Sequence, residues 1–432
     1  MLDVLKNAWS VVDIRKKIFY TLLIVLIFRV GSVIPVPFIN VSQLSTAISN
    51  GTGVNEFFSY ISALTGAGLQ YGAVFAMSVV PYINAEIIMQ LLTVAIPYLE
   101  RVAKEGEEGR KKIAKYTRFA TVILGLLQGT AYFFWLKGNN LVNVTAGDTF
   151  GLIFAGIVIV TCFTAGSAVV MWLGERVDEK GIGNGISILL FAGILARVPS
   201  GVASVFGYIS QGKYVEVVLV LILFLAIIGF IVWMTGAERK IPVQYAKRVV
   251  GRKMYGGQNT HIPVQVNISG VLPIIFASSF LTIPTMIIGF MGTSHTQSLI
   301  YRICLQFSYR GVFYALLYFA MIIGFAYFYV QIQYNPVEMA NNLRKNSGAI
   351  PGIRPGKPTS DYLRKIISRI TLIGAIFLGV LAILPVVMGN VVSLDITLGG
   401  TSILIVVGVA LDTVKSLESQ LMMRHYKGFL DD

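Results

Sequence analysis

The stretch VVLVLILFLAIIGFIVWMTGA, residues 217–237, contains no Asp, Glu, Lys or Arg. A helix of about 20 apolar residues crosses the roughly 30 Å hydrocarbon core of a bilayer, so this stretch is long enough to span a membrane. Residues 149–174, 311–337 and 370–394 are equally free of charge. The four stretches predict a protein that crosses a membrane several times.

Segments with looser edges, or with one internal charge, extend the number of predicted spans to ten. Because hydrocarbon offers no water to backbone groups, each span is expected to be a helix. The predicted fold class is therefore an all-α polytopic membrane protein with both termini on the same side. The spans are expected near residues 18–36, 72–96, 118–136, 150–172, 186–208, 215–236, 268–291, 311–333, 368–388 and 400–418.

The ten spans divide into two sets of five, in residues 1–210 and residues 211–432. An odd number of spans per half requires that any structural repeat be inverted across the membrane, as in many transport proteins. The predicted domain organisation is therefore two inverted five-helix halves, with the functional path between them.

Composition and charge agree with this interpretation. Only 13% of the residues are charged and 55% are hydrophobic, with a mean hydropathy of +0.73, whereas a soluble domain carries about 25% charged residues. These values exclude a soluble globular enzyme. The formal net charge is +14, and 29 of the 35 Lys and Arg residues fall in the termini and connections of one side. The positive-inside rule predicts that this side is cytoplasmic, and the distribution leaves no basic face for DNA.

The sequence lacks the motifs of enzymes that bind nucleotides or metals. It contains no Walker A loop, no HExxH and no nucleophile elbow, and its two cysteines and three histidines leave little room for a disulfide framework or a zinc cluster. The run Gly181-Ile182-Gly183-Asn184-Gly185 resembles a phosphate-binding loop but lacks a preceding strand, so we interpret it as a cytoplasmic turn. We predict no catalytic residue, no metal site and no cofactor.

The connection between the first two spans contains a short apolar segment, residues 54–65. Its large apolar residues recur at helical spacing, but about a dozen residues are too few to cross a bilayer. One interpretation is an amphipathic helix on the outer surface, and the other is a helix that folds back into a protein-lined cavity. The residues that set the helical spacing are Phe57, Tyr60, Ile61 and Leu64.

Two long basic connections, residues 237–267 and 334–369, are predicted on the cytoplasmic side. For most of their charges, topology and attraction to anionic lipid are a sufficient explanation. In the run Ile350-Pro351-Gly352-Ile353-Arg354-Pro355-Gly356, however, proline and glycine recur at intervals that predict a shaped loop tip. Loops of fixed shape are typical docking surfaces, so Arg354 is a candidate contact residue.

Charges inside the predicted spans are few. Arg29 lies late in the first span, where we expect its side chain to reach the outer interface, and Glu86 lies inside the second span. An ion-coupled transporter usually shows several ionisable groups near the midplane. Their scarcity favours a conduit without a charged internal binding site.

Seven short runs then occur in order along the chain. Together with ten spans and cytoplasmic termini, they closely resemble the bacterial SecY family, the channel subunits of the general protein-secretion translocon. The resemblance covers essentially all 432 residues. The runs are Ile34-Pro35-Val36-Pro37, Val80-Pro81-Tyr82-Ile83, Met171-Trp172-Leu173-Gly174-Glu175, Gly181-Ile182-Gly183-Asn184-Gly185-Ile186-Ser187, Thr260-His261-Ile262-Pro263-Val264, the loop 350–356 and Gly399-Gly400-Thr401-Ser402.

The resemblance implies an hourglass channel in the bacterial cytoplasmic membrane. Unfolded preproteins are expected to cross through it, and signal sequences and membrane proteins to leave it sideways into membrane lipids. The implied partners are SecE, SecG, the SecA ATPase and the ribosome. SecA or a translating ribosome is expected to dock on the two basic loops, through Arg252 and Lys253 in the first and Arg354 in the second.

The family also has an apolar constriction, which this sequence matches with six aliphatic residues. The first two, and likewise the next two, are four positions apart and face one way on a helix. An aliphatic ring can exclude ions by dewetting while making no polar contact that would trap a peptide. The six residues are Val79, Ile83, Ile186, Leu190, Ile275 and Ile405.

By the same resemblance, residues 54–65 correspond to the plug that blocks the outer vestibule, which favours the fold-back interpretation. The lateral exit is expected between the second and third spans on one side and the seventh and eighth on the other. Polar side chains at that seam can hold it closed, because hydrogen bonds between membrane helices are worth on the order of 1 kcal/mol each. The candidates are Asn84, Gln128 and Ser279.

Glu86 departs from the small residue expected at its place in the family. At about 100° per residue, its direction on the helix lies close to that of Val79. We therefore hypothesise that Glu86 lines the inner funnel of the channel, where water can reach it.

Two other functions stay open from the sequence. A secondary transporter for a small solute would share inverted repeats and broken helices, but it should show ionisable groups at the midplane and saturation by its substrate. An accessory SecY devoted to one exported substrate is the other alternative, although the retained loop and tenth-span runs favour the general-purpose form. Copurification of SecE would separate the transporter from both channels.

Overall fold

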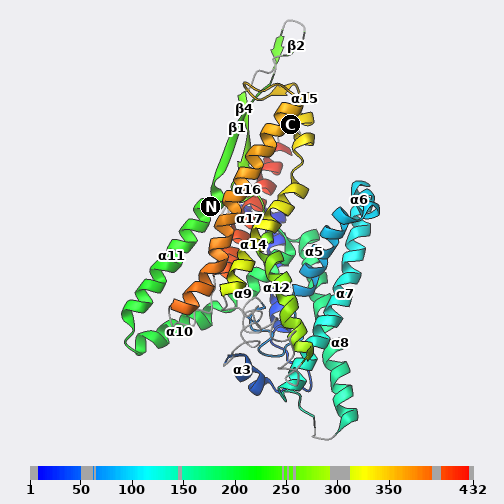
Figure 1. Cartoon of the computed structure of the whole chain (residues 1–432), viewed down its shortest axis with the longest axis vertical. Helices are drawn as coiled ribbons and strands as arrows, with labels where there is room; N and C mark the ends of the chain where they lie inside the picture. The colour runs from blue at the N-terminus through cyan, green and yellow to red at the C-terminus, as the bar shows by residue number, and fades with distance from the viewer. Residues whose placement is uncertain are drawn as a thin grey trace.

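The computed structural model is a long bundle of helices with a thin β-ribbon projecting from one end (Figure 1). Most of the helices run roughly along the long axis of the molecule. The structure describes residues 8–49, 62, 65–144, 148–245, 248–250, 253–255, 259–291, 312–391 and 400–427.

The described part of residues 1–210 is mainly helical. Between α2 and α5 the chain passes through a shorter helix and a run of turns that lies against the bundle. Its described helices are α2 (Val12–Gly31), α3 (Val41–Ser49), α5 (Val80–Ala95), α6 (Pro97–Lys104), α7 (Glu107–Gly138), α8 (Thr149–Lys180), α9 (Gly185–Leu195) and α10 (Val198–Ser210).

The C-terminal half, residues 211–432, contains the second set of long helices. The extended helix α16 packs along α14, and α11 and α17 pack against each other. Its described helices are α11 (Tyr214–Gly236), α12 (Leu272–Met291), α14 (Val312–Gln333), α15 (Pro336–Lys345), α16 (Lys357–Val391) and α17 (Gly400–Lys427).

The helical polytopic architecture predicted from the sequence is confirmed. Within the described residues, six helices are long and apolar enough to cross a membrane, and the bent pair α5 and α6 raises the number to seven. Each of the ten expected spans overlaps a helix, but α2 and α17 carry charges near their ends and the apolar part of α12 is short. The number ten therefore stays a prediction.

The all-α prediction is wrong for the first basic loop, which forms an antiparallel ribbon of β1 (Glu238–Tyr245) and β4 (Asn259–Gln265). The reason is an alternation that the charges conceal: Ile241 and Val243 are buried while their neighbours along β1 are exposed. Such a period of two is typical of a strand with one covered face. The short strand β5 (Gly348–Ala349) extends the ribbon, and β2 (Arg248–Val250) pairs with β3 (Lys253–Tyr255) beyond it.

The second expected span, residues 72–96, starts earlier than the helix that the structure contains. Residues 65–79 form turns, and the helix α5 begins only at Val80, with Pro81 in its first turn. Ser78 has a φ of 49°, a left-handed conformation that a continuous helix excludes. At the other end, Ile96 is extended before Pro97, and the chain bends by 102° into α6.

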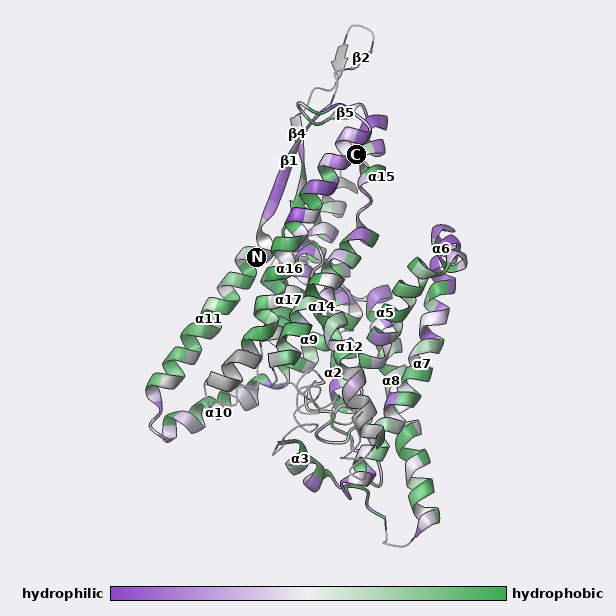
Figure 2. Cartoon of the chain, in the orientation of Figure 1, coloured by the Kyte–Doolittle hydropathy of each residue, from purple (hydrophilic) through white to green (hydrophobic). Residues whose placement is uncertain are grey.

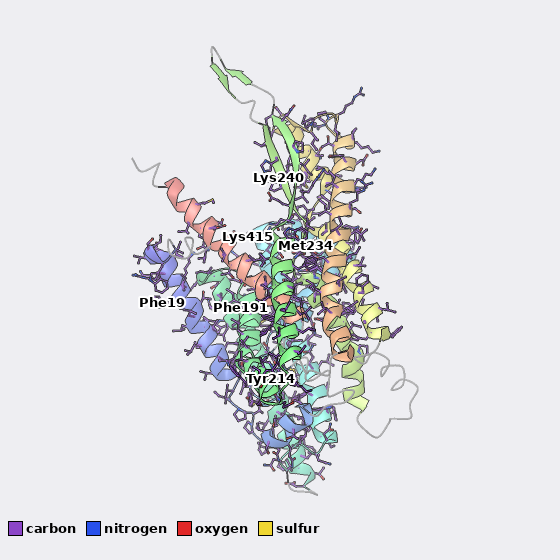
Figure 3. The ribbon with its side chains drawn as sticks, turned by 90° about the vertical axis from the view of Figure 1, so that its left-hand side faces the viewer. Phe19, Phe191, Tyr214, Met234, Lys240 and Lys415 are labelled. Atoms are coloured by element: carbon purple, nitrogen blue, oxygen red, sulfur yellow. The ribbon has the colours of Figure 1, made fainter. Side chains whose placement is uncertain are left out.

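Large apolar side chains are exposed on the outer faces of several long helices, as in a protein that meets lipid. Figure 2 shows hydrophobic residues along α7, α8 and α11, and hydrophilic residues on β1 and α6. Large apolar residues such as Ile222, Leu225 and Trp233 on α11 are more than 60% exposed, which in water would be a liability but in lipid is favourable. Figure 1 shows α11 at the left edge of the bundle, and in Figure 3 the same helix, which carries Tyr214 and Met234, faces the viewer.

Close packing in the N-terminal half depends on glycine at one backbone contact. A Cβ atom on Gly166 of α8 would lie 2.0 Å from the carbonyl oxygen of Val74, in the run of turns before α5. We expect Gly166→Ala to destabilise the purified protein by about 1–3 kcal/mol, the usual cost of overpacking. Thermal unfolding in detergent, followed by circular dichroism, measures this.

Gly229→Ala is the matched control, because nothing lies within 4 Å of the added methyl group on α11. Alanine is a better helix former than glycine, so this variant should be unchanged or slightly more stable. Equal effects of the two substitutions would contradict the close packing of α8 on residue 74.

Candidate functional site

Six aliphatic residues from four separate parts of the chain meet in one buried cluster, here called the waist cluster. Five of them are at most 9% exposed, and Ile275 is partly buried against them. Larger apolar residues from α2, α8 and α9 surround them in the same core. The waist cluster consists of Val79, Ile83, Ile186, Leu190, Ile275 and Ile405.

The start of α5 positions the first pair of the waist cluster. Val79 caps the helix and is fully buried, and its carbonyl oxygen accepts a hydrogen bond from the amide of Ile83 at 3.0 Å. Val79 and Ile83 therefore lie one helical turn apart, as the sequence predicts, although Val79 precedes the helix. The left-handed residue Ser78 turns the chain so that Val79 enters the core, and the buried Ser78 hydroxyl has no hydrogen-bond partner.

The second pair depends on the start of α9. Asn184 caps this helix by accepting a hydrogen bond from the amide of Ser187 at 2.9 Å. Ile186 then lies against Gly174 of α8, where a Cβ atom would come within 2.5 Å of the Ile186 Cδ1 atom. Gly174 belongs to the run Met171–Glu175. It leaves room for the waist residue Ile186, a packing role that the sequence did not predict.

The three candidate seam residues lie on helices that contact one another, since α12 packs against both α5 and α7. Gln128 on α7 is 8% exposed, and Asn84 on α5 and Ser279 on α12 are half-buried. Among the described residues, the buried side-chain oxygen of Asn84 has no hydrogen-bond donor. The part played by all three residues in a seam stays a prediction.

Glu86 is half-buried on α5, one turn beyond the waist residue Ile83. Asp178, near the end of α8, interacts electrostatically with it, and so does Tyr329 of α14. Polar groups of two other helices are therefore within electrostatic range of Glu86. Its place in a funnel lining stays a prediction.

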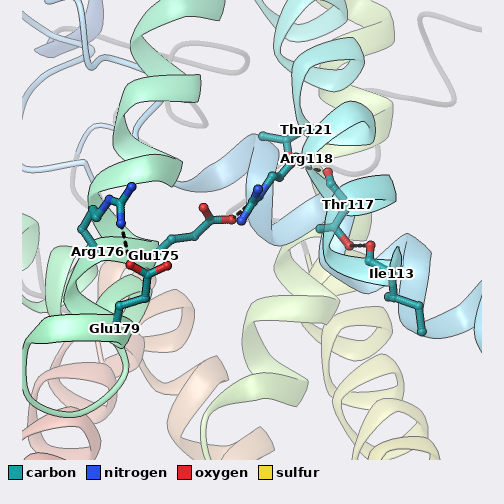
Figure 4. A network of polar contacts seen from close by, with 7 residues as sticks. All are labelled: Ile113, Thr117, Arg118, Thr121, Glu175, Arg176 and Glu179. Carbon is teal, nitrogen blue, oxygen red and sulfur yellow. Dashed lines mark hydrogen bonds and ion pairs between the residues drawn. The ribbon is translucent and has the colours of Figure 1, made fainter. Parts of the chain in front are cut away.

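An ion pair that the sequence did not predict connects the N-terminal part of α7 to the C-terminal part of α8. Arg118 Nε donates to Glu175 Oε1 at 2.7 Å, and a second pair joins Arg176 to Glu179 (Figure 4). The guanidinium of Arg176 also lies 5.4 Å from the ring centre of Trp172. Arg118 and Glu175 are 57 positions apart, so no local spacing could have indicated their contact.

The two basic loops meet in one folded unit beside the end of α16. Ile241, Val264 and Ile350 are among its buried residues, so the ribbon, α15 and the loop 350–356 share a small core. Arg354 stands exposed on this unit, and its carbonyl oxygen accepts a hydrogen bond from Thr359 Oγ1 at 2.8 Å. The loop tip that the sequence predicts is therefore held by buried apolar residues at its base and by a hydrogen bond to its backbone.

Of the other two candidate docking residues, Lys253 is among the described residues and Arg252 is not. Arg252 lies outside the described residues. Lys253 begins β3, which extends beyond the β1–β4 ribbon. Their proposed contact with a partner stays a prediction.

The four candidate plug residues, Phe57, Tyr60, Ile61 and Leu64, lie outside the described residues. The turns that follow them are described, and two helices hold these turns. Arg29 Nη1 of α2 donates to the carbonyl oxygen of Gly66 at 2.8 Å, and the hydroxyl of Tyr132 on α7 donates to that of Leu69 at 3.2 Å. Arg29 is half-buried and bonds this backbone carbonyl, and the expectation that it reaches the outer interface stays a prediction.

The chemistry available at the waist cluster is that of packed apolar side chains. The described residues contain no group of three or more His, Cys, Asp or Glu side chains that could hold a metal ion. The waist cluster itself offers neither a nucleophile nor a general acid. Such a ring can exclude water and ions from a path between helices.

Comparison with known proteins identifies the family. A family model described as SecY matches residues 73–414. The chain is 42% identical over 438 residues to the protein translocase subunit SecY of Streptomyces coelicolor, and 43% identical over 446 residues to that of Mycobacterium tuberculosis. Both alignments cover 100% of this chain and of the relative.

Solved structures agree on the fold. The structure of a protein conducting channel matches with a TM-score of 0.66 at 18% identity, covering 94% of this chain and 92% of the other. Sec61 in the canine ribosome-channel complex from the endoplasmic reticulum matches with a TM-score of 0.61 at 17% identity and the same coverage. The polytopic helical fold of these channels is therefore the fold of this chain.

The ion pair between α7 and α8 can be measured by a double-mutant cycle of Arg118→Gln and Glu175→Gln. Because Arg118 is about half exposed, we expect a coupling energy of no more than about 1 kcal/mol, which falls as salt is added. Urea or thermal unfolding of the four proteins at low and high salt gives this energy.

The control cycle uses Lys111→Gln and Glu107→Gln, a pair within α7 whose side chains are 75% and 84% exposed. Its coupling should be smaller than that of the interhelical pair. If the Arg118–Glu175 coupling were zero at low salt, the pair would not contribute to the packing of α7 on α8.

Proposed function

This chain belongs to the SecY family, and we propose that it is the central pore-forming subunit of a protein-conducting channel. The channel passes unfolded secretory proteins across a membrane and releases membrane proteins sideways into lipid. Family membership at 42% identity over the whole chain supports the translocase function, and argues against a transporter for a small solute. A channel of this kind needs no catalytic residue of its own.

The single observation that carries the proposal is the convergence of the waist cluster. Val79, Ile186 and Ile405 come from distant parts of the chain and share one apolar core. Apolar side chains at a narrow point raise the cost of hydrating an ion there. They also slide along an extended peptide without holding any particular side chain. We propose that the six waist residues form the closed constriction.

The proposed setting is the bacterial cytoplasmic membrane, crossed ten times, with both termini in the cytoplasm. The clustering of 29 of the 35 basic residues on one side supports this orientation. The proposed domains are the halves 1–210 and 211–432, related by an inverted repeat. The folded unit that carries Arg354 then stands in the cytoplasm.

The lateral exit is proposed at the seam where α12 meets α5 and α7. This seam joins the two halves, so its opening would connect the space between them to lipid. Asn84, Gln128 and Ser279 are the proposed polar residues of the seam. Residues 54–65 are the proposed plug, and Glu86 is the proposed polar residue of the inner funnel.

SecE and SecG are the proposed membrane partners, and SecA and the ribosome are the proposed cytoplasmic ones. Arg252, Lys253 and Arg354 are the residues proposed to contact SecA or the ribosome. The exposed position of Arg354 on a loop whose backbone is held by Thr359 supports this role, because a loop with a fixed backbone loses less entropy when it docks on a partner.

The proposed constriction predicts how a polar substitution at the waist changes the resting channel. Ile83→Asn should raise ion flux through the complex with SecE in proteoliposomes about tenfold, the effect of lowering the barrier to an ion by about 1.4 kcal/mol. Ile83→Leu is the matched control, since it keeps both the volume and the apolar character of the side chain. Equal flux through the two variants would contradict a constriction at Ile83.

The proposed docking role predicts a loss of translocation in Arg354→Glu. In proteoliposomes with SecE, SecA and ATP, this variant should need at least about tenfold more SecA to protect a secretory precursor from protease, since like charges across an interface cost several kcal/mol. Lys137→Glu is the control for charge reversal. Lys137 lies in the last turn of α7, on the side proposed to face away from the cytoplasm.

Two outcomes of this experiment would count against the proposal. Protection of the precursor that is independent of SecA and ATP would contradict the proposed partner. Normal protection in Arg354→Glu, or equal loss in Lys137→Glu, would remove Arg354 from the docking surface.

A further inference from the structure

Arg29 is a charged residue in the last turn of α2 to which the proposed pore assigns no role. Its side chain is half-buried, and its Nη1 atom donates a hydrogen bond to the carbonyl oxygen of Gly66 at 2.8 Å. Within the described ranges, no ion pair includes Arg29. A charge removed from water needs a partner to offset the lost hydration. Here that partner is a backbone carbonyl, so the position of Gly66 and the side chain of Arg29 depend on each other.

Gly66 also contacts the backbone of α9. A Cβ atom on Gly66 would lie 2.7 Å from the carbonyl oxygen of Gly193 and 3.1 Å from Nη1 of Arg29. The φ angles of Gly66 and Ala67 are 69° and 68°, so two successive residues are left-handed. A residue with a side chain, such as Ala67, keeps this conformation only where surrounding contacts enforce it. The guanidinium of α2 and the backbone of α9 are two such contacts.

This contact is connected to both pairs of waist residues. Leu190 lies three positions before Gly193 on α9, so less than one helical turn separates it from the carbonyl that touches Gly66. Val79 lies at the end of the run of turns that begins beside Gly66. A shift of Gly66 therefore acts on the waist cluster from two directions.

Hydrogen bonds hold the run of turns, so a shift at its first residue is passed on to its last. The amide of Ala73 donates to the carbonyl oxygen of Gly68 at 2.9 Å. The amide of Ala76 donates to that of Ala73 at 2.9 Å. The amide of Ser78 donates to that of Phe75 at 2.9 Å. At the first turn the donor is a guanidinium, and charge-assisted hydrogen bonds are about twice as strong as neutral ones.

We propose that Arg29 is a positioning residue of the constriction, because it fixes Gly66 and so both the start of the turns before Val79 and the contact with α9 near Leu190. This inference rests on the proposed function, since it assumes that the waist cluster is the constriction. Arg29 is not part of that cluster. It acts through the backbone of Gly66.

Resting ion flux through the complex with SecE in proteoliposomes tests the proposal. Arg29→Gln shortens the side chain and removes its charge, so the hydrogen bond to Gly66 is lost. We expect at least about threefold greater flux, which is part of the roughly tenfold effect that a hydrogen bond to a charged group has on an equilibrium. Lys137→Gln is the control for loss of a positive charge, because Lys137 is exposed in the last turn of α7.

Rescue by a conservative substitution separates the bond from the shape of the side chain. Arg29→Lys keeps a charged donor of similar reach, so its flux should stay within about twofold of the unmodified complex. If Arg29→Lys leaked as much as Arg29→Gln, the charged donor would not be what holds the turn.

A double variant shows whether Arg29 acts through Gly66. Gly66→Ala places a methyl group against the carbonyl of Gly193 and should itself raise the flux. If both substitutions disturb the same contact, the double variant should leak no more than about twice as much as the more permeable single variant, whereas independent effects multiply. A multiplied flux would overturn the route through Gly66.

A labelling measurement distinguishes a local shift from general loosening. In a background with Cys162→Ala and Cys304→Ala, the buried Leu69→Cys should react with maleimide at least about threefold faster when Arg29→Gln is added. Leu363→Cys, buried in the cytoplasmic unit, is the control and should react at an unchanged rate. Equal acceleration at both positions would show a global loss of structure and overturn the positioning role.

Failure of this inference differs from failure of the proposed function. Normal resting flux in Arg29→Gln or in Gly66→Ala would overturn the inference, while protection of a secretory precursor by the unmodified complex with SecA and ATP would still support the translocase. Absence of that protection would instead overturn the proposed function.

Discussion

A peptide group in hydrocarbon has no water to bond, so each amide and carbonyl of a membrane protein must find its partner within the protein. Helices meet this requirement by themselves, which is why the long apolar segments are helices. The turns of residues 65–79 meet it differently. The amide of Val74 donates a hydrogen bond to the carbonyl oxygen of Ile34, and the carbonyl oxygen of Gly72 accepts one from the amide of Val36. Arg29 and Tyr132 supply side-chain donors to two further carbonyls.

That constraint explains why this irregular region is built so tightly around glycine and buried polar groups. A Cβ atom on Gly166 would collide with the backbone at residue 74, and one on Gly31 would collide with the ring of Phe75. Close approach of this kind excludes lipid from the turns. The waist residue Val79 follows directly, so the position of the constriction depends on the bonds that hold the turns before it.

The sequence predicted the helices well because length and absence of charge are local properties. It predicted less where two local signals competed. In β1, basic residues masked the alternation of Ile241 and Val243, and in residues 72–79 an apolar composition suggested a helix that Ser78 and its neighbours interrupt. The pairing of Arg118 with Glu175 joins two helices, so only their packing, which no periodicity encodes, could reveal it.

In the candidate site, too, local spacing predicted some features and could not predict others. The i, i+4 spacing predicted that Val79 and Ile83 face one way, and the hydrogen bond between them agrees. That Ile405 joins them could not follow from spacing, because more than 300 residues lie between them in the chain. Only the family resemblance brought these positions together in advance. The waist cluster is therefore an observed structural feature that joins four distant parts of the chain. The ion-flux measurement tests its proposed action as a constriction.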